Sequence, residues 1–186
     1  MFSPMKTLYT YFPLTFFLRI AFLLLIDIVA AVIVYKLWKK NRITKNKALA
    51  IQLLVMYVTV VLFLTVLCRR TLEYHRFGVD VVSYYSSLFC GTGEVDVTEL
   101  VLNIGLFIPV GFLSCYVFSK YKIICAVLFS AFLSSMIELS QYVLRNGYVS
   151  FTDVIHNTVG SLLGAVLMAL LILIHKIITK KSEKDG

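Results

Sequence analysis

Residues 153–174 read DVIHNTVGSLLGAVLMALLILI, a run whose polar side chains all stand in its first half. A helix needs about 20 mostly apolar residues to cross a bilayer, so this run is long enough to span one. Four earlier runs have a similar length and character: 14–35, 48–68, 100–118 and 123–144. The sequence therefore predicts an all-α protein, a polytopic membrane helical bundle of about five transmembrane helices.

Composition leads to the same class of protein. Of the 186 residues, 60% are apolar or aromatic and 15% are charged. A soluble protein has roughly 45–50% apolar and about 25% charged residues. A water-soluble fold and a nucleic-acid-binding module are therefore excluded, although the pI is near 9.4.

Lysine and arginine predict an orientation, because cytoplasmic loops carry an excess of both. Most of them lie in the loops after the first and third runs and in the C-terminal tail, which share one side of a five-span chain. These residues are Lys36, Lys39, Lys40, Arg42, Lys45, Lys47, Lys120, Lys122, Lys176, Lys180, Lys181 and Lys184. The N-terminus is predicted outside the cell and the C-terminus inside it.

The chain divides on this basis into three parts. Residues 1–98 would hold two spans and an outer loop, residues 99–174 a three-helix core, and residues 175–186 a basic cytoplasmic tail. The outer loop is rich in tyrosine and phenylalanine, which favour the headgroup region. Part of it is therefore expected along the outer membrane surface. A re-entrant piece around residues 79–89 and an ordinary structured loop are the alternatives.

Six polar residues of the last three spans share one depth. Ionisable and amide side chains inside apolar spans are costly unless they are paired, and they tend to mark function. At about 1.5 Å per residue, each of the six falls within roughly 10 Å of the outer interface. These candidate binding residues are Asn103, Glu138, Gln141, Arg145, Asp153 and Asn157. Glu138 and Asp153 are also the candidate catalytic residues.

The spacing of these residues predicts which helices meet. The candidates of the fourth span stand at i, i+3 and i+7 from Glu138, so they share one helix face. In the fifth span, Asp153 and Asn157 continue into Gly160 and Gly164 as one stripe, and this G-x-x-x-G pair lets a neighbouring backbone approach closely. Because a short turn makes these two spans adjacent and antiparallel, we expect the two stripes to face each other.

Each candidate also has a purely structural interpretation. Glu138 is either a functional carboxylate or the ion-pair partner of Arg145. Asp153 would favour the positive end of the fifth helix, with Thr152 or Ser150 as its cap. The amide side chains of the set would hydrogen-bond one helix to another.

Other polar residues within the spans have less specific expectations. Asp27, near the middle of the first span, should face the bundle interior close to Tyr57 or Thr59. Arg19 should extend along the membrane to the outer surface. Pro109 removes a helical hydrogen bond and favours a kink in the third span, with a cavity beneath it.

No metal site or cofactor is expected. The four cysteines show no C-x-x-C spacing, and a disulfide is not favoured. His156 has no second histidine or carboxylate at the spacing of a zinc-binding helix.

Three segments, taken in order, carry a resemblance to a known family. Residues 99–112 read ELVLNIGLFIPVGF, residues 137–141 read IELSQ and precede Arg145, and residues 152–160 read TDVIHNTVG. The VanZ-like family has N-x-x-x-F-x-P-x-G-F, then E-x-x-Q, an arginine, and D-x-x-x-N-x-x-G. The chain resembles that family over residues 99–166.

The resemblance implies a multi-pass protein of the bacterial cytoplasmic membrane, since the family is bacterial and its name-giving member is associated with teicoplanin resistance. An outward-facing polar pocket would then bind a membrane lipid or a lipid-linked cell-wall precursor. Arg145 would hold a phosphate or carboxylate, and the amide side chains would supply hydrogen bonds. The alternatives are an intramembrane enzyme, with Glu138 or Asp153 as general base, and a structural helper subunit of an envelope complex.

Overall fold

The computed structural model describes residues 13–68, 76–77, 81–90, 97–146 and 148–185. Among these residues, five helices are long and apolar enough to cross a membrane. They are α2 (Pro13–Lys39), α3 (Lys45–Leu62), α5 (Val97–Val117), α6 (Lys122–Leu144) and α7 (Phe151–Asp185). A π-helical turn, η1 (Phe63–Leu67), extends α3. The predicted all-α class and the five predicted spans are confirmed.

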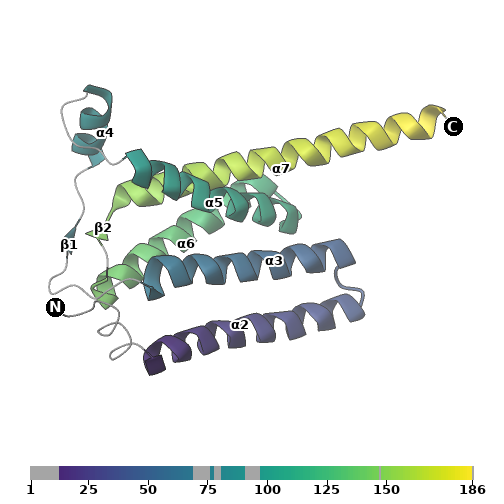
Figure 1. Cartoon of the computed structure of the whole chain (residues 1–186). Coiled ribbons are helices and arrows are strands. Elements are labelled where there is room, and N and C mark those ends of the chain that lie inside the picture. Colours follow the sequence, from purple (N-terminus) through teal and green to yellow (C-terminus); the bar gives the residue numbers. More distant parts are fainter. Residues whose placement is uncertain (1–12, 69–75, 78–80, 91–96, 147, 186) are drawn as a thin grey trace, which may run out of the picture.

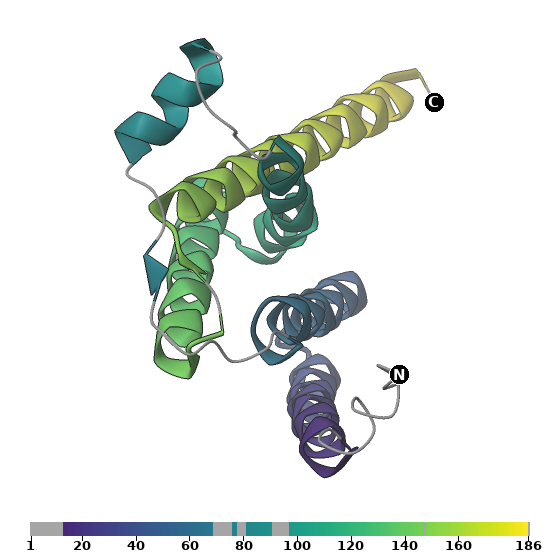
Figure 2. The ribbon, with the colours of Figure 1, turned by 60° about the vertical axis from the view of Figure 1, so that its left-hand side comes forward.

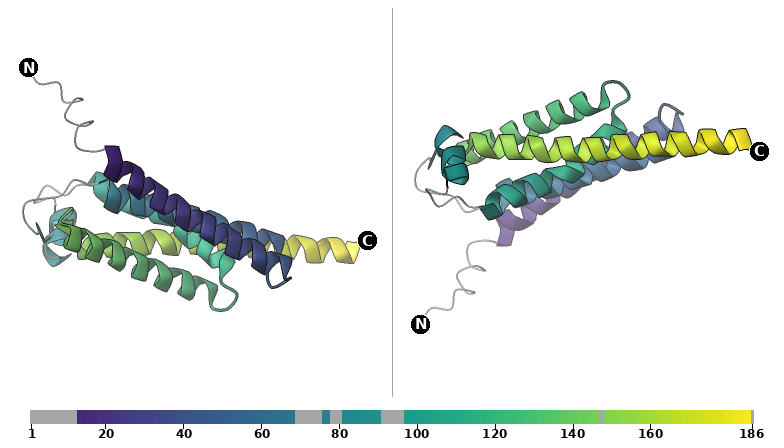
Figure 3. Two further views of the ribbon diagram at one scale, coloured as in Figure 1. Left: turned by 90° about the horizontal axis from the view of Figure 1, so that it is seen from below. Right: turned by 90° about the horizontal axis from the view of Figure 1, so that it is seen from above.

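The five helices run side by side in alternating directions (Figures 1 and 3). Helices α2, α5 and α7 begin at the end of the bundle where α3 and α6 finish, and this end is called the polar end below. The opposite, basic end holds the two lysine-rich loops, which meet where the Lys47 Nζ donates to the Ser119 Oγ at 2.8 Å. Figure 1 shows α7 projecting beyond the other helices there. The orientation of these two ends across a membrane stays a prediction.

Helices α5, α6 and α7 contact one another, α3 packs on α5, and α2 packs on α3 at the edge of the bundle (Figure 2). An apolar core fills the space between α3, α5 and α6. Its buried side chains are Leu54, Val61, Val66, Phe107, Val110 and Ile137. Large apolar side chains cover much of the outer surface, as a bundle surrounded by lipid requires.

The glycines of α7 set the distance to α5. A Cβ at Gly160 would lie 2.1 Å from the Ile104 carbonyl oxygen, and one at Gly164 would lie 1.9 Å from that of Ile108. The predicted close approach of a neighbouring backbone is thus confirmed. The expectation that the whole stripe faces the fourth span was wrong for these glycines, which face α5. The stripe is only about 60° wide, and α7 touches α5 on one side of it and α6 on the other.

Short elements close the polar end. Strand β1 (Arg76–Phe77) pairs in parallel with β2 (Tyr148–Val149), which precedes α7, and joins the long loop to the α6–α7 turn. Helix α4 (Val81–Cys90) lies across the direction of the bundle, beside the start of α7 (Figure 1). The aromatic-rich stretch therefore contains a helix. Its residues 69–75, 78–80 and 91–96, Tyr74 included, lie outside the described residues.

Polar groups inside the first spans have partners in the neighbouring helix. The Thr59 hydroxyl donates to the Asp27 carboxylate at 3.1 Å. Of the two neighbours expected for Asp27, the structure therefore shows Thr59. The Tyr57 hydroxyl instead donates to the Leu106 carbonyl at 3.0 Å. That carbonyl lies three residues before Pro109, and α5 continues as one helix through the proline.

Candidate functional site

Helix α6 has one buried polar face. Ser130, Ser134, Glu138 and Gln141 stand at i, i+4, i+8 and i+11, and all four side chains are buried. This spacing places them in one row along the helix. Burying such groups costs free energy unless they are hydrogen-bonded, so their partners on α7 and η1 determine what this face does.

Glu138 reaches the start of α7. Its side chain is only 6% exposed, and its Oε2 accepts the backbone N–H of Ser150 at 2.8 Å. Ser150 directly precedes α7, so its amide is one that the helix itself leaves without an acceptor. Because the helix N-terminus carries a positive partial charge, a negative charge is stabilised at this position.

A pocket of about 310 Å³ opens between α6 and α7 beside this carboxylate. Apolar side chains, including Leu139 and Phe151, form much of its wall, and the residues with polar side chains in the lining are Ser135, Glu138, Tyr142 and Ser150. Phe151 is 74% exposed at the rim. Of the six candidate residues, all of which the structure describes, Glu138 alone lines this pocket. The site is thus a largely apolar pocket on the side of the bundle with a buried carboxylate in its wall.

Gln141 binds the end of the second span. The carbonyls of residues 65, 66 and 67 are among the last of α3 and η1, where a helix has no further N–H groups to offer. The Gln141 side chain donates to the Thr65 carbonyl at 3.1 Å. Asn146 donates to the Val66 carbonyl at 2.5 Å, and Arg19 donates to the Leu67 carbonyl at 2.6 Å. Three side chains from other segments therefore fix this helix end. Arg19 reaches the polar end, as the sequence indicated.

Several buried amide atoms, on residues that do not line the pocket, have no hydrogen-bond partner among the described residues. The Asn157 Nδ2 donates to the Ser134 Oγ at 2.8 Å, but the Asn157 Oδ1 has no partner. The same holds for the Asn103 Nδ2 and the Gln141 Oε1. An unsatisfied buried polar atom costs about 1–3 kcal/mol. Such atoms lie on α5, α6 and α7, so the interior of the bundle holds polar atoms whose hydrogen bonds the described residues do not complete.

Arg145 occupies a position that usually holds glycine. It follows the last residue of α6 with φ at 53°. Its N–H donates to the Tyr142 carbonyl, and the Asn146 N–H donates to that of Gln141, which is the pattern of a Schellman motif. The left-handed conformation costs a residue with a Cβ about 1–2 kcal/mol. The exposed arginine is therefore kept at a cost in stability.

Asp153 and the residues before it begin α7. Asp153 lies in the first helical turn and is half-buried. The hydroxyls of Ser150 and Thr152 contact each other at 2.5 Å. Of the two expected caps, Ser150 directly precedes the helix, whereas Thr152 lies inside its first turn. Asp153 lies within a turn of the backbone that Glu138 binds.

His156 joins α4 to α7. The imidazole is buried, and its Nε2 lies 3.1 Å from the Tyr85 hydroxyl. The ring of Tyr84 lies 5.5 Å away, between ring centres. The part of the chain that the structure describes contains no group of three His, Cys, Asp or Glu side chains that could hold a metal ion. The geometry of His156 is that of a docking contact for the short helix.

Four contact residues were missed by the sequence analysis. Ser134 looked like an ordinary small residue, and Asn146 belongs to an Asn-Gly pair that is typical of turns. His156 and Tyr85 meet through a loop whose path no local pattern reveals. The row of serines one helical turn apart on α6, leading to Glu138, was the one available signal for Ser134.

Known proteins are similar to this chain at the level of a family. Comparisons with curated proteins and with solved structures find no significant match. The family model for VanZ/LLP1 matches residues 22–173. This match includes most of α2 and all of α3, beyond the three segments that carried the resemblance. The chain belongs to the VanZ/LLP1 family.

Proposed function

We propose that this protein binds the polar head of a lipid-linked envelope component, such as a cell-wall precursor, in the pocket between α6 and α7. The polar end would face outward from the bacterial cytoplasmic membrane. The observation that carries the proposal is the buried Glu138 carboxylate in the wall of a 310 Å³ pocket at the start of α7. A carboxylate is costly inside a membrane span and tends to mark function, and the polar head of a bound ligand would offer it further hydrogen-bond donors.

The lining of the pocket favours an amphiphile. Glu138 and Ser135 would accept hydrogen bonds from the hydroxyl and amide groups of a sugar–peptide head. Leu139 and Phe151 would contact the start of its apolar chain, since both side chains are exposed on the side of the bundle. Arg145, just past the end of α6, would hold a phosphate by two parallel N–H donors.

Binding of this kind would shield the head of a precursor at the outer leaflet. A glycopeptide such as teicoplanin would then find less of its target, or the precursor pool would be better maintained. Resistance to such an antibiotic, or maintenance of the cell envelope, is the role we propose for the protein.

A second candidate function is that of a helper subunit. The contacts of Gln141 and Asn146 with the carbonyls at the end of the second span favour it, because they hold helices together without leaving a site. An intramembrane enzyme with Glu138 or Asp153 as general base is a further alternative. Turnover of the bound lipid would distinguish it from a binding protein.

The functional test is teicoplanin susceptibility of a sensitive bacterial host that expresses the protein. Glu138→Gln keeps the size of the side chain and removes its charge, so we expect resistance to fall while membrane abundance on an immunoblot stays near wild type. Ser135→Phe, which fills the pocket, should do the same.

A double variant separates the pocket from a structural role. If Glu138 and Arg145 served only as the ion pair that the sequence suggests, leucine at both positions would restore function, since paired charges are often replaceable by apolar residues. We expect the double variant to stay inactive at normal abundance. Full resistance of this variant would refute the proposed pocket.

The proposed orientation has its own test. In a cysteine-free background, single cysteines at Lys45 and Ser182 should react with an impermeant thiol reagent only after lysis. A cysteine at Ser83 should react in intact protoplasts. Labelling at Lys45 in intact cells would place the polar end inside and contradict the proposal.

A further inference from the structure

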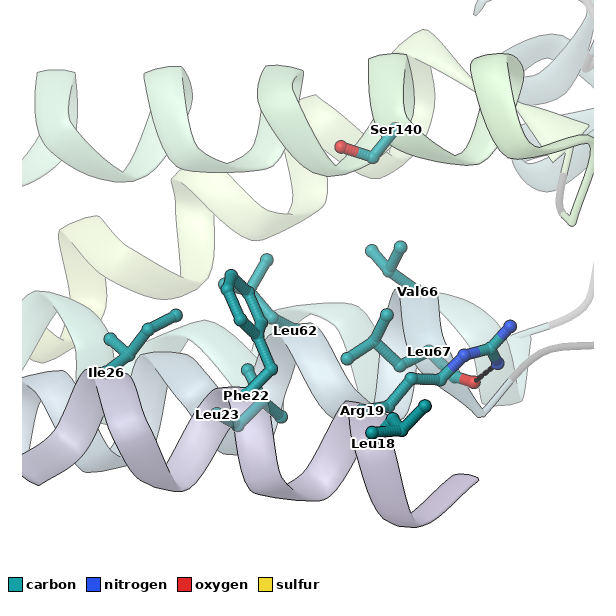
Figure 4. Close-up of a pocket in the computed structure, with 9 residues that line it drawn as sticks. All are labelled: Leu18, Arg19, Phe22, Leu23, Ile26, Leu62, Val66, Leu67 and Ser140. Atoms are coloured by element: carbon teal, nitrogen blue, oxygen red, sulfur yellow. Dashed lines mark hydrogen bonds between the residues drawn. The ribbon is translucent and has the colours of Figure 1, made fainter. Parts of the chain in front are cut away.

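A second hollow lies on another side of α6, between that helix and α2 (Figure 4). It has a volume of about 360 Å³, and its walls are almost wholly apolar. The side chains that form it include Phe22, Leu23 and Ile26 of α2, with Leu62 and Val66 facing them. We call it the α2 groove. Helix α2 packs on α3, and the groove separates α2 from α6.

Arg19 marks the polar end of the α2 groove. Figure 4 shows its guanidinium beside the last turn of η1, where Nη1 donates to the Leu67 carbonyl at 2.6 Å. A guanidinium has five N–H donors, and this one makes a single hydrogen bond with the described residues. The structure gives it no acidic side chain among them. A half-buried cation thus stands at the mouth of an apolar groove, and the described residues supply no counter-charge to it.

We infer that the α2 groove binds an anionic phospholipid. One acyl chain would lie along Phe22, Leu23 and Ile26, and the phosphate would sit at Arg19. The planar fork of arginine matches the geometry of phosphate oxygens. Arg19 lies near the start of α2 and beside the end of η1, which is the depth of the headgroups in a helix of this length. Charge complementarity favours a head with a net negative charge over a zwitterionic one, whose ammonium would compete with Arg19 for the phosphate.

This site is separate from the pocket at Glu138. Ser140 lines the α2 groove and Ser135 lines the pocket, and five residues of helix turn them about 140° apart. The two hydroxyls have the same local bond, since each donates to the carbonyl four residues earlier, at 2.7 Å and 2.8 Å. Phenylalanine at either position therefore blocks one site and leaves the other open.

The test is native mass spectrometry of the protein taken from nanodiscs with equal amounts of phosphatidylglycerol and phosphatidylcholine. We expect the wild type to retain one phosphatidylglycerol in preference to phosphatidylcholine. Arg19→Gln should lower the retained fraction about tenfold or more, because a charge-assisted hydrogen bond is lost. Ser140→Phe should lower it similarly with Arg19 intact, whereas Ser135→Phe should leave it unchanged.

Arg42→Gln is the control for charge, since Arg42 lies in the loop at the basic end. It removes the same charge away from the groove and should retain the lipid. If Arg19→Gln does not fold, Ser140→Phe decides alone. Equal retention by the wild type and Ser140→Phe would overturn the inference. So would a wild type without phosphatidylglycerol, or a dimer with a second chain seated on α2.

Discussion

The two sides of α7 meet their neighbours in different ways. Toward α5, glycines at 160 and 164 bring backbone against backbone, and a Cβ at Gly164 would come within 1.9 Å of a carbonyl oxygen. Toward α6, the contacts are side-chain hydrogen bonds, such as Asn157 to Ser134, with buried amide atoms left over. The α5 side leaves no room for a larger side chain. The α6 side holds buried amide atoms without a hydrogen-bond partner among the described residues.

This difference separates what holds the bundle together from what the bundle can bind. Close backbone packing stabilises membrane helices without any polar group. The α5 side of α7 therefore packs closely without relying on the side-chain hydrogen bonds of the α6 side. In the proposed function, the Glu138 carboxylate is kept in an apolar medium at a cost because a ligand uses it. Variants on the two sides should accordingly differ in kind, as stability changes on one and activity changes on the other.

The largest effect is expected at Gly164. Gly164→Leu would press a side chain against the Ile108 carbonyl and the Phe112 amide, which are backbone atoms that cannot turn aside. We expect a loss of more than about 3 kcal/mol in the free energy of unfolding, the upper range for overpacking. Thermal unfolding in detergent measures it. Gly105→Leu is the control, since a Cβ at Gly105 meets nothing within 4 Å. Equal unfolding temperatures for the two variants would show that α5 does not pack against Gly164.

A smaller and opposite change is expected at Arg145. Glycine tolerates the left-handed conformation, so Arg145→Gly should raise the free energy of unfolding by about 1 kcal/mol. Resistance should fall all the same, because the guanidinium is lost. Unfolding and teicoplanin susceptibility are measured on the same variant. A stabilised and fully active Arg145→Gly would show that the arginine has no part in binding.

The smallest effect is expected at Ser134. Ser134→Ala removes the acceptor of the Asn157 amide, and an interhelical hydrogen bond in a membrane is worth about 0.6 kcal/mol. Ser135→Ala is the matched control, because that hydroxyl donates to Ala131 of its own helix. A loss at Ser134 as large as at Gly164 would mean that both sides of α7 are structural.

Much of this fold could be predicted from the sequence, because hydropathy and helix length act locally. The five spans and the shared depth of the polar residues follow from composition and from the rise per residue. The sequence did not predict that Gly160 would face α5. Asn157 and Gly160 differ by about 60° around α7, and only the packing of three helices decides that one faces α6 and the other α5.

The contacts of the site depended still more on distant parts of the chain. Gln141 and Asn146 bind carbonyls at the end of the second span, which lack intrahelical donors because the helix ends there. No pattern around Gln141 reveals where another helix ends. The docking of α4 on His156 likewise depends on the path of a long loop.

The most direct test of the polar side is the lipid that the purified protein retains. Protein would be isolated gently from bacterial membranes that contain a lipid-linked cell-wall precursor, and its native mass spectrum recorded for the wild type, Glu138→Gln and Gly105→Leu. We expect the precursor mass on the wild type and on Gly105→Leu, and its loss from Glu138→Gln at unchanged fold and abundance. A wild type without the precursor, or a Glu138→Gln variant that retains as much of it, would contradict the assignment of the α6 side of α7 as the binding side.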